Sequence, residues 1–427
     1  MAAPIAFLIA LEESWLGISR LPAGLKKAGF EVVAFCIPGS YLSQTRYIDR
    51  HIFWEKHQRG ARLRAAQAIV GAIKTIQPTI IIPGDEEAVM LLHKIYALAS
   101  RFSLTGRTRD TLARSLTDPQ TLSAVLMKDA FSEFAARCGV RVPKNEVVPH
   151  AEAAIAITRD WGYPVVLKQS LGYAGGNVLI CHDDGELRRA FESFQPKVIA
   201  PTGWKGLLKR KLLGSSSALD DRVSIQQFIQ GPTALFSFAA DRGTLLRYVA
   251  AIQVRCHPPK TGPSCVVRTM ASAEMEQFAR SMAKALNFSG FGGFDFILDD
   301  ATGQAYALEC QPRPVYLTNI GALCGANLPE ALFAQLTGQE PEPQPAIAET
   351  TVALFPNEYN RDPNSEYLTS GLHDIPWDDP DLVKALHPTY YAEFAQSMGH
   401  LASLLMILLA GPLLHLAHGA AAIASLI

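Results

Sequence analysis

The sequence lacks several patterns that define common classes of protein. Its seven cysteines are scattered over 427 residues, with no CxxC pair and no histidine at metal-ligand spacing. This distribution favours reduced thiols in a cytoplasmic protein. The 39 Lys and Arg residues balance 40 Asp and Glu residues, so net charge gives no argument for nucleic acid as a partner. The N-terminal apolar run has no basic flank and ends at Glu12 and Glu13, which predicts a first strand and not a signal peptide.

Two familiar nucleotide-binding motifs are also absent. No GxGxxG follows the first expected strand, so a dinucleotide site is not expected. In the P-loop a lysine follows the glycines and opens a helix, whereas here Lys168 ends an expected strand and precedes the glycine-rich stretch 170–177. An ammonium group beside backbone N–H groups can hold phosphates. A flexible hairpin turn is the alternative interpretation of the same stretch.

Residues 1–115 alternate between strand and helix patterns, which predicts a small, doubly wound α/β domain. The strand patterns lie at 5–11, 31–37 and 79–82, and the helical patterns end near Gly29 and Thr75. Ligands of open parallel sheets bind at the carboxyl ends of the strands. The loops at 12–17 and 84–87 are therefore candidate substrate contacts, with solvated turns as the alternative.

The chain from residue 116 onwards has a different pattern. A long helical stretch at 118–138 contains Lys128, and strands are expected at 163–168 and 223–229. The strand patterns at 235–240 and 245–255 follow directly and predict an antiparallel sheet.

A hairpin at 291–314 brings several polar groups to one face. Two alternating segments enclose the turn sequence DDATGQ, and centring the loop near Thr302 places Asp295 opposite Glu309. The two-residue period adds Gln311 and Arg313 to the same side. Opposed carboxylates repel each other unless a cation lies between them, and Mg²⁺ prefers such oxygen ligands. A solvated hairpin face is the alternative.

The order of these motifs resembles the ATP-grasp superfamily of carboxylate-amine ligases, and in particular its bacterial branch of predicted ATP-dependent carboligases. The resemblance covers about residues 1–340. It implies a Rossmann-like domain (1–115) followed by a two-subdomain ATP-grasp domain with antiparallel sheets (116–340), whose lid subdomain is expected at about 150–228. ATP would lie between the lid and the larger subdomain.

The resemblance also implies a set of site residues. The implied metal ligands, for Mg²⁺ with Mn²⁺ as an alternative, are Asp295, Glu309 and Gln311. The implied catalytic residues are Arg313, Lys168 and Arg268. The implied ATP-binding residues are Lys128, Lys168, Ser170, Gly172, Gly175, Gly176, Gln226, Gln227, Phe228, Ile229, Thr233 and Arg255.

The sequence departs from the family at two places. The family usually has Asn where Gln311 stands, and acids around the hinge where Gln226, Gln227 and Thr233 stand. A glutamine keeps the amide oxygen on a longer arm, so the metal geometry is in question. Loss of the hinge acids puts the ribose contact in question.

The function that the resemblance implies is ATP-dependent ligation. A carboxylate would be activated as an acyl phosphate and joined to an amine, with release of ADP and phosphate. The alternatives are a nucleotide-binding pseudoenzyme and a kinase that phosphorylates a small molecule. The expected partners are small-molecule carboxylates and amines, no nucleic acid, and a second copy of the chain.

The remaining segments carry no assigned chemistry. Residues 196–222 are expected to be an insertion with a basic amphipathic piece at 204–213, and residues 341–393 a proline-rich linker with a turn-rich extension. Residues 394–427 contain no Asp, Glu, Lys or Arg. They predict apolar helices that either pack on protein or attach the cytoplasmic chain to the inner face of a membrane.

Overall fold

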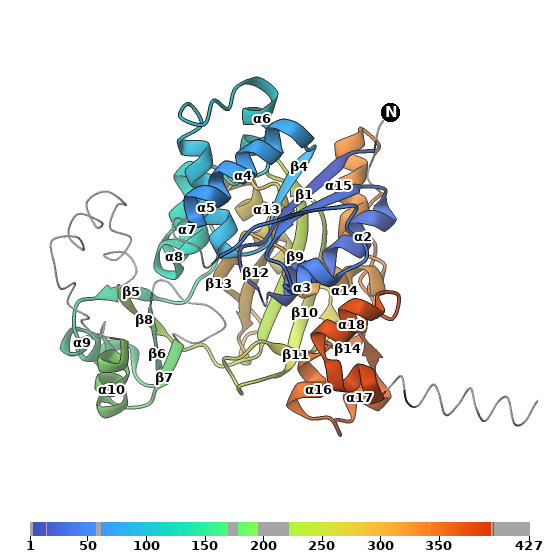
Figure 1. Ribbon diagram of the computed structural model, residues 1–427. Helices are drawn as coiled ribbons and strands as arrows, with labels where there is room; N and C mark the ends of the chain where they lie inside the picture. The colour runs from blue at the N-terminus through green and yellow to red at the C-terminus, as the bar shows by residue number, and fades with distance from the viewer. Residues whose placement is uncertain are drawn as a thin grey trace, which may run out of the picture. The chain divides into compact units, whose positions relative to one another are not determined.

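The computed structural model (Figure 1) describes residues 3–13, 15–56, 61–169, 178–194, 222–340, 342–393 and 396. Residues up to Asp374 form one compact unit. The described strands of this unit lie in three sheets, of four, seven and four strands.

The first sheet is parallel, with the order β3-β2-β1-β4. Its strands are β1 (Ile5–Ile9), β2 (Glu31–Cys36), β3 (Arg50–Phe53) and β4 (Ile80–Pro83). Successive residues of β1 enter two different cores: Leu8 packs in one with Leu21, and Phe7 packs in the other with Ile69. Because both faces of the sheet are covered, the strand is apolar at every position. The strands expected near 5–11, 31–37 and 79–82 are confirmed.

The second sheet is antiparallel for most of its width, with the order β13-β12-β9-β10-β11-β14-β15. Its strands are β9 (Thr233–Asp241), β10 (Thr244–Cys256), β11 (Ser264–Met270), β12 (Gly290–Leu298), β13 (Ala305–Gln311), β14 (Thr351–Ala353) and β15 (Leu372–His373). Ala239 of β9 joins the same core as Leu8, whereas Phe236 and Phe238 face the core under helix α13 (Ala273–Ala285). The parallel sheet and the seven-stranded sheet therefore share a core.

The third sheet has the order β5-β8-β6-β7 and a small core of its own. Its elements are β5 (Asn145–Val148), β6 (Val165–Gln169), β7 (Val178–Cys181) and β8 (Val223–Gln227), with helices α9 (Ala151–Trp161) and α10 (Asp184–Phe194). In Figure 1 these elements gather at one side of the large sheet. They span most of residues 150–228, where a lid subdomain is predicted, and their first strand begins earlier, at Asn145. We call this sheet the lid sheet after that prediction.

Two expected elements were wrong in their extent. The helix expected at 118–138 is broken at Met127, whose backbone is extended, into η1 (Pro119–Thr121), α7 (Leu122–Leu126) and α8 (Lys128–Arg137). The strand expected at 223–229 ends at Gln227, so Phe228 and Ile229 lie beyond it. Lys128 is consequently the first residue of a helix, where backbone N–H groups and the helix dipole favour an anion.

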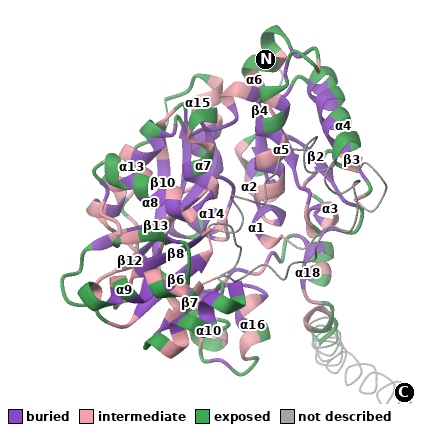
Figure 2. Ribbon diagram, turned by 90° about the vertical axis from the view of Figure 1, so that its left-hand side faces the viewer, coloured by how far each residue is buried: buried purple, intermediate pink, exposed green. Residues whose placement is uncertain are grey.

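The other described helices of this unit are mostly short and amphipathic. They are α1 (Leu16–Ser19), α2 (Leu21–Ala28), α3 (Tyr41–Gln44), α4 (Ala61–Ile76), α5 (Glu86–Ala97), α6 (Gly106–Arg114), α14 (Leu317–Ile320), η2 (Gly321–Cys324), α15 (Leu328–Thr337), α16 (Asn357–Arg361) and α17 (Tyr367–Ser370). Figure 2 shows that buried residues are concentrated in the strands, while exposed residues gather on the outer sides of helices such as α4 and α9.

Residues 375–427 form a second unit. Its described part contains α18 (Pro380–Leu386) and a contact between the rings of Trp377 and Tyr390, whose centroids are 6.0 Å apart. No helix among the described residues is long and apolar enough to cross a membrane. The predictions for 394–427, for the basic piece at 204–213 and for the loop at 170–177 fall on residues outside the described ranges, apart from residue 396.

Two glycine substitutions test how tightly the segment after β8 is held. A Cβ on Gly231 would lie 1.8 Å from the Leu298 carbonyl oxygen, whereas a Cβ on Gly71, inside α4, would meet nothing within 4 Å. We expect Gly231→Ala to lower the free energy of unfolding by about 1–3 kcal/mol, because backbone must move. Gly71→Ala should raise it by about 0.5–1 kcal/mol through helix propensity. Urea unfolding of both variants checks the pair, and equal stability of Gly231→Ala and wild type would contradict the steric argument.

Candidate active site between the lid and the hairpin

A cavity of about 430 Å³ is lined both by strands of the lid sheet and by the hairpin of the large sheet. Most of the described residues predicted for the site line it. These are Lys128, Lys168, Gln226, Gln227, Phe228, Ile229, Thr233, Asp295, Glu309, Gln311 and Arg313. Ser170, Gly172, Gly175 and Gly176 lie outside the described residues.

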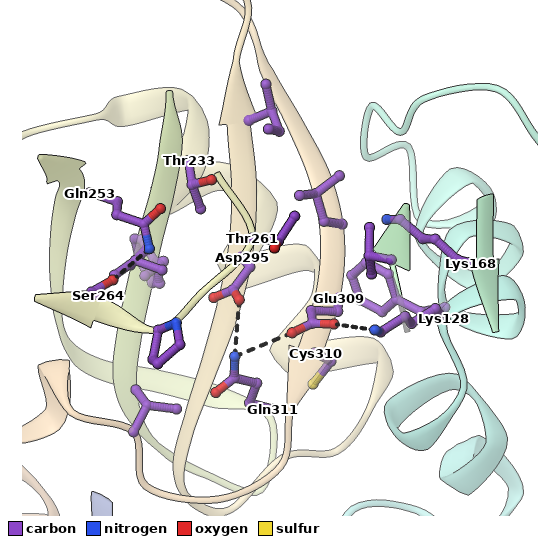
Figure 3. Close-up of a pocket in the computed structure, with 18 of the residues that line it drawn as sticks. Lys128, Lys168, Thr233, Gln253, Thr261, Ser264, Asp295, Glu309, Cys310 and Gln311 are labelled. Carbon is purple, nitrogen blue, oxygen red and sulfur yellow. Dashed lines mark hydrogen bonds and ion pairs between the residues drawn. The ribbon is translucent and has the colours of Figure 1, made fainter. Parts of the chain in front are cut away.

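The hairpin of β12 and β13 has the register that the sequence predicts, with Asp295 paired to Glu309. The Gln311 amide donates to Asp295 Oδ2 at 3.0 Å and to Glu309 Oε1 at 3.4 Å (Figure 3). Enclosure in the cavity and the facing Glu309 carboxylate raise the pKa of Asp295 well above its usual value. The pair is therefore a site of concentrated negative charge that a cation would stabilise.

Two lysines face this pair from the other wall of the cavity. Lys128 Nζ lies 3.8 Å from Glu309 Oε2. Lys168 extends from β6 of the lid sheet toward the same region (Figure 3) and is only 7% exposed. Burial, followed by the neighbouring Lys128 ammonium, lowers the pKa of Lys168 to about 8, although Glu309 and Asp295 act in the opposite direction. A buried ammonium group next to a second one favours an anionic ligand between them.

The hinge residues lie at the end of β8, which is a central strand paired with β5 and β6. Gln226 is buried, and the Gln227 N–H donates to the Lys144 carbonyl oxygen at 2.9 Å. The backbone N–H of Gln227 is therefore already paired within the protein, and the predicted contacts of the hinge with a nucleotide stay a prediction. Phe228 and Ile229, just past the strand, line the cavity.

Arg255 and Arg268 do not line the cavity, contrary to the prediction. Gln253 pairs with Val267, and both line the cavity, but a bulge after Gln253 pairs Arg255 with Val266. The extra residue turns Arg255 to the opposite face, where it lies over the Tyr367 ring. Arg268 follows Val267 and also faces outward, 3.4 Å from Glu349.

Several residues that line the cavity are not predicted by the sequence patterns. Lys260, Thr261 and Gly262 reach it from the hairpin loop between β10 and β11, and Gln253 donates to Ser264 Oγ at 2.9 Å beside them (Figure 3). The resemblance points to Arg255 and Arg268 at the flanks of this loop, and not to its centre. A lysine two residues before a glycine in an expected turn is the signal that could have identified these residues.

Arg313 lines the cavity and is 5% exposed. Its guanidinium forms an ion pair with Glu86 and lies 3.8 Å from the centre of the Trp15 ring. Glu86 and Trp15 come from the two loops, at 84–87 and 12–17, that the sequence predicts as candidate substrate contacts. The structure thus brings both loops to the residue expected to bind an oxyanion.

Comparison with known proteins agrees with this geometry. Residues 127–214 match the family model of the carbamoyl-phosphate synthase L chain, ATP binding domain. A putative urea carboxylase from Emericella nidulans is 25% identical over 224 residues. The C-terminal section of a carbamoyl phosphate synthase large chain from Methanopyrus kandleri is 22% identical over 258 residues. The matches cover 52% and 56% of this chain, but only 17% and 44% of the relatives' lengths.

Comparison with solved structures identifies the fold of this chain. Biotin carboxylase from Campylobacter jejuni has a TM-score of 0.58 at 18% identity, covering 81% of this chain and 73% of that one. N5-carboxyaminoimidazole synthetase from Staphylococcus aureus, complexed with ADP, has a TM-score of 0.56 at 14% identity, covering 84% and 86%. The biotin carboxylase domain dimer of Hydrogenobacter thermophilus 2-oxoglutarate carboxylase, in complex with MgADP, ADP and bicarbonate, has a TM-score of 0.57 at 17% identity, covering 81% and 73%. The chain has an ATP-grasp fold, and the predicted resemblance to the ATP-grasp superfamily is confirmed.

Proposed function

We propose that the protein is an ATP-dependent ligase that activates a carboxylate as an acyl phosphate and joins it to an amine. The observation that carries this proposal is the cavity wall on which Asp295, Glu309 and Gln311 face Lys128 and Lys168. Oxygen ligands for a divalent cation and ammonium groups for phosphates would then meet at one place.

The donor set fits Mg²⁺, the ion that accompanies ADP in the 2-oxoglutarate carboxylase structure. Among the described residues no three His, Cys, Asp or Glu side chains gather as a closed metal site. Gln311, whose N–H group donates to both carboxylates here, would ligate through its oxygen once the amide turns. Two carboxylates and one amide oxygen would leave positions free, as expected for Mg²⁺ that is bound partly through phosphates and water. When bound, the ion would neutralise phosphate charge. Mn²⁺ is the alternative ion.

The remaining roles fall to the chain's own residues. Lys128 and Lys168 would hold phosphate oxygens, and Phe228 and Ile229 would contact the base. A carboxylate oxygen would attack the γ-phosphorus while the bond to the bridging oxygen breaks and ADP leaves. The amine nitrogen would then attack the acyl carbon, phosphate would leave with the C–O electron pair, and the amine would lose a proton. Enclosure by the lid would protect the acyl phosphate from water.

The test is ADP release by the purified chain with MgATP and pools of carboxylic acids and amines, repeated with hydroxylamine as a trap. A ligase should release ADP only with a carboxylate and should yield a hydroxamate. ADP release with a hydroxyl compound and no hydroxamate would identify a kinase. Binding of ATP without ADP release in any pool would leave a nucleotide-binding module and would overturn the proposal.

The pH dependence of ATP use should report on Lys168. The ammonium group is charged below its pKa of about 8 and neutral above it, so phosphate binding is favoured at low pH and lost at high pH. We expect kcat/KM for ATP to fall as the pH rises past about 8. Lys168→Arg, which keeps its charge, should remove this decline. Persistence of the decline in that variant would assign it to another group.

The hinge should select adenine. Gln226 is buried and lines the cavity, and its amide can pair with the adenine amino group or, after a flip, with a guanine carbonyl oxygen. Gln226 can form either pairing, so the preference for adenine follows from the resemblance to ATP-dependent enzymes. We expect kcat/KM for ATP to exceed that for GTP by at least about tenfold. Equal use of the two nucleotides in the same assay would contradict adenine selection.

The remaining predictions extend this function. By the resemblance, the substrates are small molecules and the compartment is the cytoplasm. The dimer formed by the biotin carboxylase domain of 2-oxoglutarate carboxylase supports a homodimer, which sedimentation of the purified chain tests. Attachment to the inner face of a membrane through 394–427 stays a prediction, tested by comparing the fractionation of the full chain with a version that ends at Glu393.

A further inference from the structure

One part of the cavity wall carries charge of both signs next to apolar surface. It is formed by Trp15, Glu86, Met90, Arg313 and Tyr316, which all line the cavity, and we call it the charged end. Trp15 comes from the segment after β1, Glu86 and Met90 from helix α5 after β4, and Arg313 and Tyr316 from the segment after β13. None of them belongs to the lid sheet or to the hinge.

The guanidinium group of Arg313 has one hydrogen-bond donor without a partner among the described residues of the charged end. One guanidinium nitrogen pairs with Glu86, and Nη1 donates to the Pro314 carbonyl oxygen at 3.4 Å. The Nε atom is buried and has no hydrogen-bond partner among the described residues. A buried guanidinium N–H without a partner is costly, and a carboxylate is the group that best satisfies it.

Several carboxyl groups lie near the single guanidinium group of Arg313. Glu12 lies within electrostatic range of Glu86 and Arg313. Burial, followed by the acidic neighbours Asp85, Glu86 and Glu87, raises the pKa of Glu12 to about 7, whereas Arg313 lowers this pKa. Asp85 is already occupied, because it accepts from the N–H groups of Leu11, Glu12 and Ala88. Glu87 pairs with exposed Arg62 at 3.4 Å. Of these four acids Glu86 lines the cavity, so it is the carboxylate that a bound cation would meet beside Arg313.

We propose that the charged end binds the zwitterion of an α-amino acid with an apolar side chain, its carboxylate on Arg313 and its ammonium on Glu86. The inference rests on the proposed function in that the amino acid would be one of the ligase's substrates. A simple carboxylate would satisfy Arg313 but leave the acids repelling each other, and a simple amine would leave Arg313 Nε unpaired. A single small molecule with both charges can pair with Arg313 through its carboxylate and with the acidic side through its ammonium. Its side chain then contacts Trp15, Met90 and Tyr316.

Calorimetric titration of the full chain with MgADP tests the proposal with three probes. L-phenylalanine carries both charges, 3-phenylpropionate lacks the ammonium and 2-phenylethylamine lacks the carboxylate. Wild type should bind L-phenylalanine at least about tenfold more tightly than either analogue. Leucine and methionine serve as further amino acids if the phenyl ring is too large.

The variant Glu86→Gln distinguishes specific binding of the amino acid from a general disruption of the site. It should weaken L-phenylalanine binding and strengthen 3-phenylpropionate binding, because Arg313 is then released from its internal carboxylate, whereas a misfolded site would weaken both. Glu87→Gln, a neighbouring acid that does not line the cavity, is the matched control and should retain the wild-type preference.

The outcomes distinguish this inference from the proposed function. Absence of amino-acid binding, or equal binding of amino acid and 3-phenylpropionate, would overturn the inference even if other carboxylates support ADP release. Selective amino-acid binding without ADP release would support the inference and count against the ligase. Addition of hydroxylamine identifies the role of the bound amino acid: its hydroxamate marks it as the activated acid, and a requirement for a second carboxylate marks it as the amine. Either role is consistent with the proposal.

Discussion

Glu309→Gln is expected to reduce Mg²⁺-dependent ADP formation by at least about 10²-fold, the scale of losing one preorganised electrostatic contact. Glu309 pairs directly with Asp295 and also lies 3.8 Å from Lys128. The substitution removes the charge that both a metal ion and the lysine use, while it preserves shape. Initial rates across a Mg²⁺ titration, with circular dichroism of both proteins, are the measurement.

The control for this variant is Glu133→Gln. Glu133 is exposed on α8, where it pairs with Arg137 one helical turn away at 3.1 Å. Its loss should leave the rate and the Mg²⁺ dependence unchanged. A Glu309→Gln enzyme with wild-type rate and intact fold would remove the metal assignment.

Arg313→Ala is expected to lower the free energy of unfolding by about 3–5 kcal/mol, because it leaves Glu86 without its partner in a largely enclosed site. The Glu86 side chain is only 16% exposed, and Trp15 loses the guanidinium that lies over its ring. Chemical unfolding of the variant gives the value. Arg313→Lys, which keeps charge without the planar fork, should cost about 1–3 kcal/mol of transition-state stabilisation in kcat/KM.

A double variant checks the reason for this loss. When both partners of a buried ion pair are replaced by uncharged groups, much of the stability returns, because no unpaired charge remains. Glu86→Gln combined with Arg313→Met should therefore be more stable than Arg313→Ala. Additive losses from the two positions would show that the ion pair does not account for the effect.

The sequence predicted the hairpin register correctly because two strict alternations enclose a short turn. Asp295 and Glu309 must then face each other. The break at Met127 was not predictable, since the apolar spacing continues through it and only the extended backbone of one residue interrupts the helix. The bulge after Gln253 was also invisible, because periodicity carries no sign of one extra residue. The pairing of Glu86 with Arg313 joins distant parts of the chain, which no local pattern encodes.

The core shared by the parallel sheet and the seven-stranded sheet has a consequence while the chain is being synthesised. Leu8 and Val32 of the parallel sheet pack in one cluster with Val249 and Leu328, which the ribosome adds much later. At about 5–20 residues per second, the chain takes on the order of ten to forty seconds to extend from residue 115 to residue 330. During that interval this face of the parallel sheet has only its local cover, such as Leu21 and Leu25 of α2, and the uncovered remainder is the surface on which a chaperone would act.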